Sequence, residues 1–248
     1  FNQRLTGRRA YGAARLPLSG LQAIRAAVDG ATVNDVILAV CGGALRDYLL
    51  HHGELPDASL VAVAPINARG RRGGTVESGN DISAMRVPLA TSEADPLARL
   101  AAVRRCTVAA KAGQAGLAER LVADLGREVP SLPLAGLSWL LRSERIARSQ
   151  ANLVVTNVPS SRQPLYMCGA RLVAQFGMGP VTHGLGLFIS ANGYHDTIAI
   201  CLTADAAQVP DVEFLGRCVE RSYDELSRAA GSGRRRKPAS RAKPKSKR

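Results

Sequence analysis

A long helix predicted from Thr32 to Leu50 constrains the fold more than any other segment of the sequence. Its apolar side chains recur at helical spacing, and Gly53 follows as a stop signal. Two adjacent glycines, Gly42 and Gly43, weaken the helix propensity in its middle. Glycine at such a position predicts the close approach of another backbone, so we expect a second element to pack against the centre of this helix.

The start of the same helix, Thr32-Val33-Asn34-Asp35, combines a capping pattern with one unexplained polar residue. Thr32 is suited to the N-cap position, and Asp35 stands where the acidic partner of a capping box is found. Capping accounts for Thr32 and Asp35 but leaves Asn34 unexplained. Because a capped helix start is rigid, the amide of Asn34 is a candidate site group.

The remaining pattern predicts strands mixed with helices. We expect strands at 11–18, 59–66, 82–89, 152–158, 171–176, 186–191 and 197–203, and helices from 19, at 96–112, 117–128 and 134–148, and from 210. This combination predicts an α+β domain over residues 1–230, with a mixed β-sheet and flanking helices. The last two strands form a hairpin that can turn at Asn192-Gly193, a favoured type I′ pair, or at His195-Asp196.

Two further polar positions stand at the ends of predicted strands. Asn157 closes the apolar run ANLVVTN just before Val158-Pro159, where proline cannot continue a ladder. An amide at such a place commonly donates to a loop or to a ligand, so Asn157 is a second candidate. Gly79-Asn80-Asp81 is first of all a turn into the strand that begins at Ile82.

The charge is unevenly distributed along the chain. The formal net charge is +13, but residues 231–248 carry nine Lys or Arg and no acid, and residues 16–230 are balanced. Because segment 231–248 consists mainly of Gly, Ser, Pro, Arg and Lys and can form no core, it is predicted to be a disordered basic tail. Such a tail fits nucleic acid or an anionic membrane, and the lack of aromatic residues in it disfavours nucleic acid.

Several classes of chemistry find no support in the sequence. The phosphate-binding pattern GxxxxGK[ST], the dinucleotide pattern GxGxxG, the metalloprotease pattern HExxH and the nucleophile elbow GxSxG are all missing. Five scattered cysteines without a CxxC pair argue against a disulfide framework and a cysteine zinc site, and we expect no metal. Adjacent His51 and His52 follow the long helix, where an interaction with the helix dipole explains them.

The chain is expected to be a processed or truncated intracellular protein, because it opens with Phe1 and shows no signal peptide. The charge-free stretch Leu172 to His195 is long enough to cross a bilayer. Its glycines, proline and polar residues argue against a transmembrane helix.

The order of several motifs resembles the C-terminal domain of the bacterial wax ester synthase/diacylglycerol acyltransferase family. The resemblance extends from residue 1 to about residue 228. The motifs that carry it are TVNDVILAVCGGALRDYL at 32–49, VAPINAR at 63–69, GNDIS at 79–83, NLVVTNVPSS at 152–161 and LTAD at 202–205.

The resemblance implies one lobe of a CoA-dependent acyltransferase fold, in which two lobes enclose a tunnel. It implies acyl transfer from acyl-CoA, as a substrate without any permanent cofactor, to diacylglycerol or a long-chain alcohol. The catalytic base is then a histidine of an HHxxxDG motif on the N-terminal lobe. The segment from His51 to Ala58 imitates that motif, but Asp57 comes one residue late and Ala58 replaces the glycine. We therefore expect no catalytic base in this chain, and the N-terminal lobe as its partner.

The same resemblance suggests roles for particular residues. Asn34, Asp35, Asn80, Ser83 and Asn157 are expected to shape the site, and Arg69, Arg71 and Arg72 to contact CoA phosphates. A lipid-synthesising relative also favours an anionic membrane or lipid-droplet surface as the partner of the basic tail, on a cytoplasmic protein bound peripherally. The alternatives are a non-catalytic structural or regulatory partner lobe and, less favoured, a basic-tailed nucleic-acid-binding protein.

Overall fold

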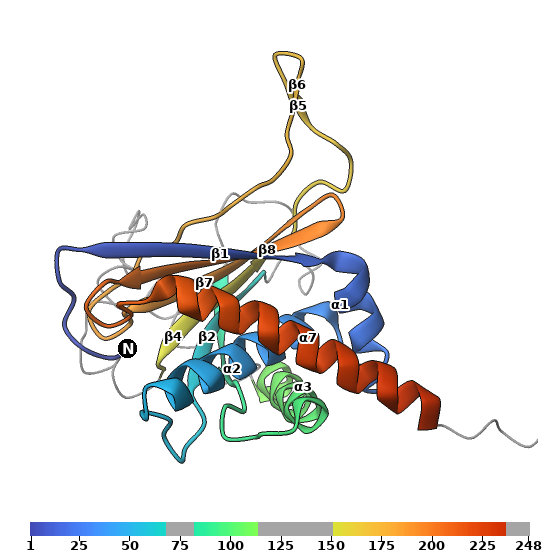
Figure 1. Ribbon diagram of the computed structural model, residues 1–248, viewed down its shortest axis with the longest axis horizontal. Helices are drawn as coiled ribbons and strands as arrows, with labels where there is room; N and C mark the ends of the chain where they lie inside the picture. Colours follow the sequence, from blue (N-terminus) through green and yellow to red (C-terminus); the bar gives the residue numbers. More distant parts are fainter. Residues whose placement is uncertain (68–81, 114–150, 237–248) are drawn as a thin grey trace, which may run out of the picture.

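A mixed six-stranded β-sheet organises the chain, of which the computed structural model describes residues 1–67, 82–113 and 151–236 (Figure 1). The strand order is β1-β8-β7-β4-β2-β3. β4 runs parallel to both β2 and β7, whereas the pairs β1–β8, β7–β8 and β2–β3 are antiparallel. The strands are β1 (Arg9–Pro17), β2 (Val61–Asn67), β3 (Ile82–Pro88), β4 (Leu153–Val158), β7 (Leu187–Tyr194) and β8 (Thr197–Asp205).

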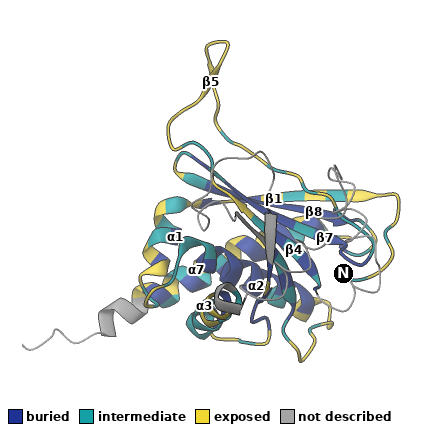
Figure 2. Cartoon of the chain, turned by 180° about the vertical axis from the view of Figure 1, so that it is seen from behind, coloured by how far each residue is buried: buried dark blue, intermediate teal, exposed yellow. Residues whose placement is uncertain are grey.

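The described helices lie together on one face of this sheet (Figure 1). They are α1 (Leu18–Arg25), α2 (Val33–His51), α3 (Pro96–Gly113) and α7 (Val212–Arg236). α2 contacts each of the other three, so it is the central helix of the layer. Alternate strand residues, such as Leu187, Ile189 and Ala191 of β7, point into the core between the layers. Figure 2 shows this buried interior in dark blue. The predicted α+β fold with flanking helices is confirmed.

The two glycines of α2 mark places where neighbouring groups come very close. A Cβ atom on Gly42 would overlap the carbonyl oxygen of Leu89, which follows β3. A Cβ atom on Gly43 would overlap the hydroxyl of Ser222 in α7 and the guanidinium of Arg99 in α3. The close approach predicted from the glycine pair is therefore confirmed, and it fixes how α2 packs against the rest of the domain.

The strand predicted at 171–176 is wrong. The structure has only a short antiparallel hairpin there, β5 (Tyr166–Met167) and β6 (Ala170–Arg171), and no strand from 172 to 181. The main sheet offers this segment no central place, because β7 already pairs with β4 on one side and with β8 on the other. The large apolar residues of the segment, Leu172, Val173 and Phe176, remain exposed.

The β7–β8 hairpin turns at His195-Asp196 and not at Asn192-Gly193. Tyr194 pairs with Thr197, and His195 takes a positive φ of 54°. Asn192 is buried within β7, where its amide donates to the hydroxyl of Ser190 at 2.9 Å. Burial of this amide in the sheet overrides the turn preference of the Asn-Gly pair.

The last helix continues beyond the boundary predicted at residue 230. α7 extends to Arg236, so residues 231–236 of the predicted disordered tail are helical. Adding residues to an existing helix is far less costly than starting one, so Gly231 does not end it. Residues 237–248 and the helices predicted at 117–128 and 134–148 lie outside the described residues. Within the described ranges, no helix is both long and apolar enough to cross a membrane.

Candidate functional site

The first turn of α2 is fixed by a complete capping box. The Asp35 amide donates to the hydroxyl of Thr32 at 3.2 Å, and the Thr32 amide donates to Oδ2 of Asp35 at 2.8 Å. The fully buried Asp35 also accepts a hydrogen bond of 2.7 Å from Thr107 of α3 at its second carboxylate oxygen. One oxygen of Asp35 thus holds the helix start and the other joins it to α3, which leaves this residue a positioning role.

Asn34, one residue earlier, lies beside the end of β4. Nδ2 of Asn157 donates to Oδ1 of Asn34 at 3.3 Å, which joins the helix layer to the sheet. Asn157 has the same orientation as the buried Leu153 and Val155, so it faces the helices at the point where its strand ends. The structure therefore brings together the two amides that the sequence singled out separately.

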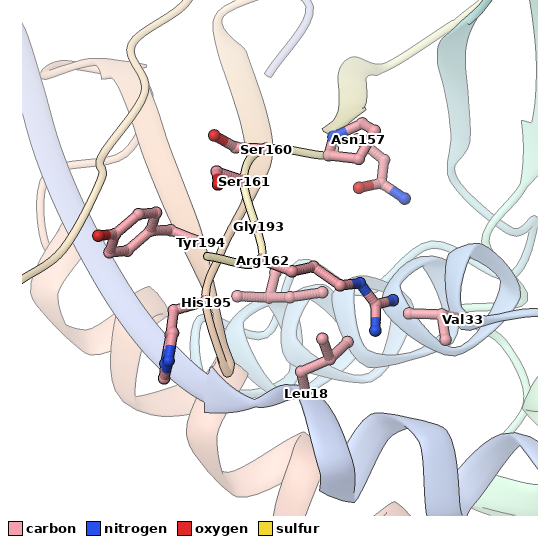
Figure 3. A pocket seen from close by; sticks show the side chains of 11 residues that line it. Leu18, Val33, Asn157, Ser160, Ser161, Arg162, Gly193, Tyr194 and His195 are labelled. Atoms are coloured by element: carbon pink, nitrogen blue, oxygen red, sulfur yellow. The ribbon is translucent and has the colours of Figure 1, made fainter. Parts of the chain in front are cut away.

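A pocket of about 200 Å³ is lined by Asn157 and by Val33, the neighbour of Asn34 in α2 (Figure 3). Its apolar wall consists of Leu18, Val33 and Ile198. The polar wall comes from the segment that follows β4 and from the tip of the β7–β8 hairpin: Asn157, Ser160, Ser161, Arg162, Tyr194 and His195. In Figure 3 the side chain of Arg162 extends toward Val33 at the start of α2. The pocket thus has an apolar side and a side that can donate hydrogen bonds to an oxygen or an anion.

The hairpin tip is tied to the segment that follows β4. The backbone amide of His195 donates to the carbonyl of Ser161 at 2.9 Å. Nδ1 of His195 lies 3.1 Å from the carboxylate of Asp196, and this hydrogen bond lowers the pKa of Asp196 below its ordinary value. The side chain of Asp196 is 79% exposed to solvent, so the pair is a surface feature of the turn. It holds the tip in shape and supplies no buried base.

The other predicted site residues are placed only in part. Ser83 pairs with Ile66 across β3 and β2, and continuing the β2–β4 register puts it at the same sheet end as Asn157, about 10 Å away. The side chain of Ser83 is not described. Asn80 and the three arginines proposed for CoA phosphates, Arg69, Arg71 and Arg72, lie outside the described residues.

The histidine pair lies at the opposite end of α2 from the pocket. Asn34 and His51 are 17 residues apart on one helix, which is about 25 Å. His52 contacts Asp211 with its Nε2 at 3.2 Å, and the ring of His51 lies against that of Phe214 in α7. The pair therefore belongs to the contact between α2 and α7 and is remote from the amide pair.

Sequence reasoning missed Arg162 and Tyr194 in this pocket. Arg162 directly follows the motif that ends at Ser161, so its position after the strand was the available signal. Tyr194 had no such signal, because only the true position of the hairpin turn brings it to the pocket. Among the residues that the structure describes, no three His, Cys, Asp or Glu side chains gather as a metal site would require.

The chain matches known acyltransferases over most of its length. The sequence pattern of the WS/DGAT C-terminal domain matches residues 78–227. A Mycobacterium tuberculosis protein, provisionally named a diacylglycerol O-acyltransferase, is 34% identical over 233 residues, which cover 93% of this chain and 50% of that protein. The O-acyltransferase WSD of Acinetobacter baylyi is 34% identical over 218 residues, covering 87% of this chain and 45% of that enzyme.

The structure of the chain is also similar to that of a solved enzyme. The wax ester synthase/diacylglycerol acyltransferase of Marinobacter aquaeolei matches with a TM-score of 0.71 at 26% identity, covering 93% of this chain and 51% of that one. The chain spans about half the length of the curated relatives it matches.

Proposed function

Because this chain belongs to the wax ester synthase/diacylglycerol acyltransferase family as its C-terminal domain, we propose that it is one half of an acyl-CoA-dependent O-acyltransferase. The proposed reaction transfers the acyl group of a long-chain acyl-CoA to the hydroxyl of diacylglycerol or of a long-chain alcohol. The products are triacylglycerol or a wax ester and free CoA. The observation that supports this role most directly is the contact between Asn34 and Asn157 beside a pocket.

The proposed mechanism divides the chemistry between two halves. A histidine on the N-terminal half removes the proton of the acceptor hydroxyl, and the resulting oxygen attacks the thioester carbonyl. The carbonyl becomes an oxyanion in a tetrahedral intermediate, which then expels CoA as its thiolate. The thiolate takes up the proton from the histidine, so that no other reactant is needed.

In this scheme the amide pair stabilises the oxyanion. Oδ1 of Asn34 is occupied by Asn157, and this contact orients the Asn34 amide so that its N–H groups are available to a developing negative charge. Preorganised donors of this kind stabilise the transition state more than the ground state.

The polar and apolar walls of the pocket suggest how the acyl donor lies. Arg162 presents a guanidinium at the pocket, and we assign it to an acyl-CoA phosphate, together with Arg69, Arg71 and Arg72 as first proposed from the sequence. Leu18, Val33 and Ile198 would lie against the apolar part of the donor. We also keep the proposal that the basic residues from 231 onward bind an anionic membrane or lipid-inclusion surface.

The test is acyl transfer from palmitoyl-CoA to hexadecanol or dipalmitoylglycerol, measured with three preparations. These are the chain alone, the N-terminal half of the Acinetobacter baylyi enzyme alone, and the two combined. Turnover only in the combined sample supports the proposal. Turnover by the chain alone would contradict the assignment of the base to the other half. No turnover in a demonstrated complex of folded halves would favour a non-catalytic partner lobe.

A further inference from the structure

A short loop carries most of the polar wall of the pocket. Residues 159–165 follow β4, and we call them the arginine loop because Arg162 is the one charged residue among them. Pro159 and Pro164 stand near its two ends, and each has a backbone φ that the proline ring fixes. The loop therefore has fewer accessible conformations than its length alone would allow.

A small turn closed by a serine presents Arg162. The hydroxyl of Ser161 accepts a hydrogen bond of 3.1 Å from the Gln163 amide and donates one of 2.9 Å to the Gln163 carbonyl. Both bonds span Arg162, which therefore lies at the apex of the turn. Serine commonly closes turns in this way. The turn fixes the local shape of the loop, but contacts with another element must fix its place in the pocket.

The tip of the β7–β8 hairpin supplies those contacts. The backbone amide of His195 donates to the Ser161 carbonyl at 2.9 Å, and the hydroxyl of Tyr194 accepts from the Leu165 amide at 2.9 Å. The loop is thus held on both sides of Arg162. His195 adopts a φ of 54°, which is uncommon for a residue with a side chain. Backbone in such a conformation is often found where a site needs a particular geometry.

The hairpin tip is a rigid support for the loop. Tyr194 is only 5% exposed, and it closes the β7–β8 ladder by pairing with Thr197. The backbone amide of Leu18, at the start of α1, donates to the Asp196 carbonyl at 2.8 Å. Because Leu18 belongs to the apolar wall of the pocket, the tip contacts both walls. It therefore fixes the polar wall relative to the apolar wall.

We propose that Tyr194 is a positioning residue that makes the site selective for acyl donors carrying a phosphate, as acyl-CoA does. Its hydroxyl holds Leu165, and the arginine loop then presents the guanidinium of Arg162 to the phosphate. Figure 3 shows this guanidinium directed toward Val33 and away from the ring of Tyr194, so Tyr194 acts through the loop backbone. The inference rests on the proposed function, which takes acyl-CoA as the donor.

The chemistry of arginine explains why the loop has to be held. A guanidinium binds phosphate best through two parallel N–H groups, which requires a defined orientation. Ordering a mobile loop when the ligand binds would weaken that binding, whereas a loop held in advance avoids this cost. The acyl chain and its thioester have no charge for Arg162 to bind. Loss of the Tyr194 hydroxyl should therefore weaken the binding of the phosphate part alone.

Tyr194→Phe tests the proposal, because it keeps the ring in the pocket wall and removes only the hydroxyl. The protein is this chain joined to the N-terminal half of the Acinetobacter baylyi enzyme. Calorimetry without an acceptor measures the Kd of decanoyl-CoA and of decanoyl-pantetheine, which has the same thioester but no phosphate. We expect the Kd of decanoyl-CoA to rise about threefold to tenfold and that of decanoyl-pantetheine to change less than about twofold.

Two further variants connect this effect to Arg162. Arg162→Ala should weaken decanoyl-CoA at least as much as Tyr194→Phe does, and the double variant should be no weaker than Arg162→Ala alone. Tyr166→Phe is the matched control, because it removes a phenol hydroxyl from a side chain that is 65% exposed and outside the pocket. It should leave both Kd values unchanged.

Proteolysis measures the position of the loop without any ligand. Trypsin cleaves after arginine, and a folded segment must open locally before it is cleaved. In the same joined protein, we expect Tyr194→Phe to speed cleavage after Arg162 at least about threefold, as followed by mass spectrometry. Tyr166→Phe should leave this rate unchanged.

Three results would overturn the proposal. They are an unchanged Kd for decanoyl-CoA in Tyr194→Phe, an equal loss of affinity for both donors, and an unchanged rate of cleavage after Arg162. Equal loss would mean that the hydroxyl supports the fold in general and not the phosphate contact. Because these readouts are binding and proteolysis, they do not depend on turnover. A phosphate-selective loss in a protein that transfers no acyl group would retain this proposal and reject the proposed function.

Discussion

The side-chain amide of Asn157 donates a hydrogen bond to Oδ1 of Asn34 at 3.3 Å, across 123 positions of sequence. Asn157 is the last residue but one of the central strand β4, and Asn34 lies in the first turn of the central helix α2. The contact therefore depends on the packing of the sheet against the helix layer. We expect a change that shifts α2 along the sheet to separate the two amides.

Gly42→Ala tests that packing. Helix propensity alone predicts that alanine stabilises a helix by about 1 kcal/mol over glycine. The new Cβ would overlap the Leu89 carbonyl, so we expect a loss of about 1–3 kcal/mol in the free energy of unfolding. Urea denaturation measures whether the free energy of unfolding rises or falls in the variant. Gly231→Ala is the matched control, because nothing lies within 4 Å of its Cβ position in α7, and it should stabilise. Stabilisation by both variants would contradict the close approach.

Asp35→Asn tests the positioning role of the buried carboxylate. The variant keeps the size of the side chain but weakens acceptance from Thr32 and Thr107. We expect the free energy of unfolding to fall by about 1–3 kcal/mol, as for the loss of a helix cap and a buried hydrogen bond. Thr107→Val, which removes one of these donors, should cost less. Equal stability of Asp35→Asn and the original chain, measured in urea, would refute this role.

Asp205 is expected to make the free energy of unfolding depend on pH under acidic conditions. Burial by itself raises the pKa of Asp205, but hydrogen bonds from the Thr6 hydroxyl and amide and from the Ala207 amide outweigh it and lower the pKa below 3.8. Ionised Asp205 therefore stabilises the fold above the unfolded-state pKa of about 3.9. That contribution to stability is lost as the pH falls through the pKa of Asp205 in the folded state, which is the lower of the two pKa values.

Asp205→Asn should consequently be less stable than the original chain at pH 6, by about 1–3 kcal/mol. This difference in the free energy of unfolding should shrink below about pH 4, where the carboxyl of Asp205 begins to take up a proton. Thr6→Val, which keeps the backbone donor, should show a smaller difference with the same pH trend. Urea denaturation between pH 3 and pH 7 measures all three chains, and a gap that is independent of pH would contradict the assignment.

Arg162→Ala tests the contact proposed with an acyl-CoA phosphate. In the combined enzyme we expect the KM for palmitoyl-CoA to rise about fivefold to tenfold with little change in kcat, because a charge-assisted hydrogen bond to the bound substrate is lost. The control is a palmitoyl thioester of N-acetylcysteamine, which has no phosphate. If the variant loses the same factor with that substrate, Arg162 does not contact phosphate.

Much of the architecture could be predicted from local pattern. The capping box at Thr32 and Asp35, the central helix and the close approach at its glycines follow from rules that act within a few residues. The family resemblance, drawn from the order of five short motifs, is confirmed by the match over residues 78–227. Each of these features leaves a signal in short segments of the chain, so one sequence is enough to find them.

The errors arose where distant parts of the chain decide the outcome. The hairpin was predicted with two possible turns, and burial of Asn192 in the sheet selects His195-Asp196, three residues after the favoured Asn192-Gly193 pair. The apolar run at 171–176 has the character of a strand, but β4 and β8 already flank β7. The two candidate amides were found one by one, and only the tertiary fold shows that they touch. Their contact could not be derived from spacing.

The most direct test of the account is the kcat of acyl transfer by the combined enzyme carrying Asn34→Ala, Asn157→Ala or both. If the amide pair stabilises the oxyanion, Asn34→Ala lowers kcat by about 100-fold to 1000-fold with little change in KM. Asn157→Ala has a smaller effect, and the double variant is no worse than Asn34→Ala alone, because Asn157 acts through Asn34. An unchanged kcat in folded Asn34→Ala would contradict the central claim.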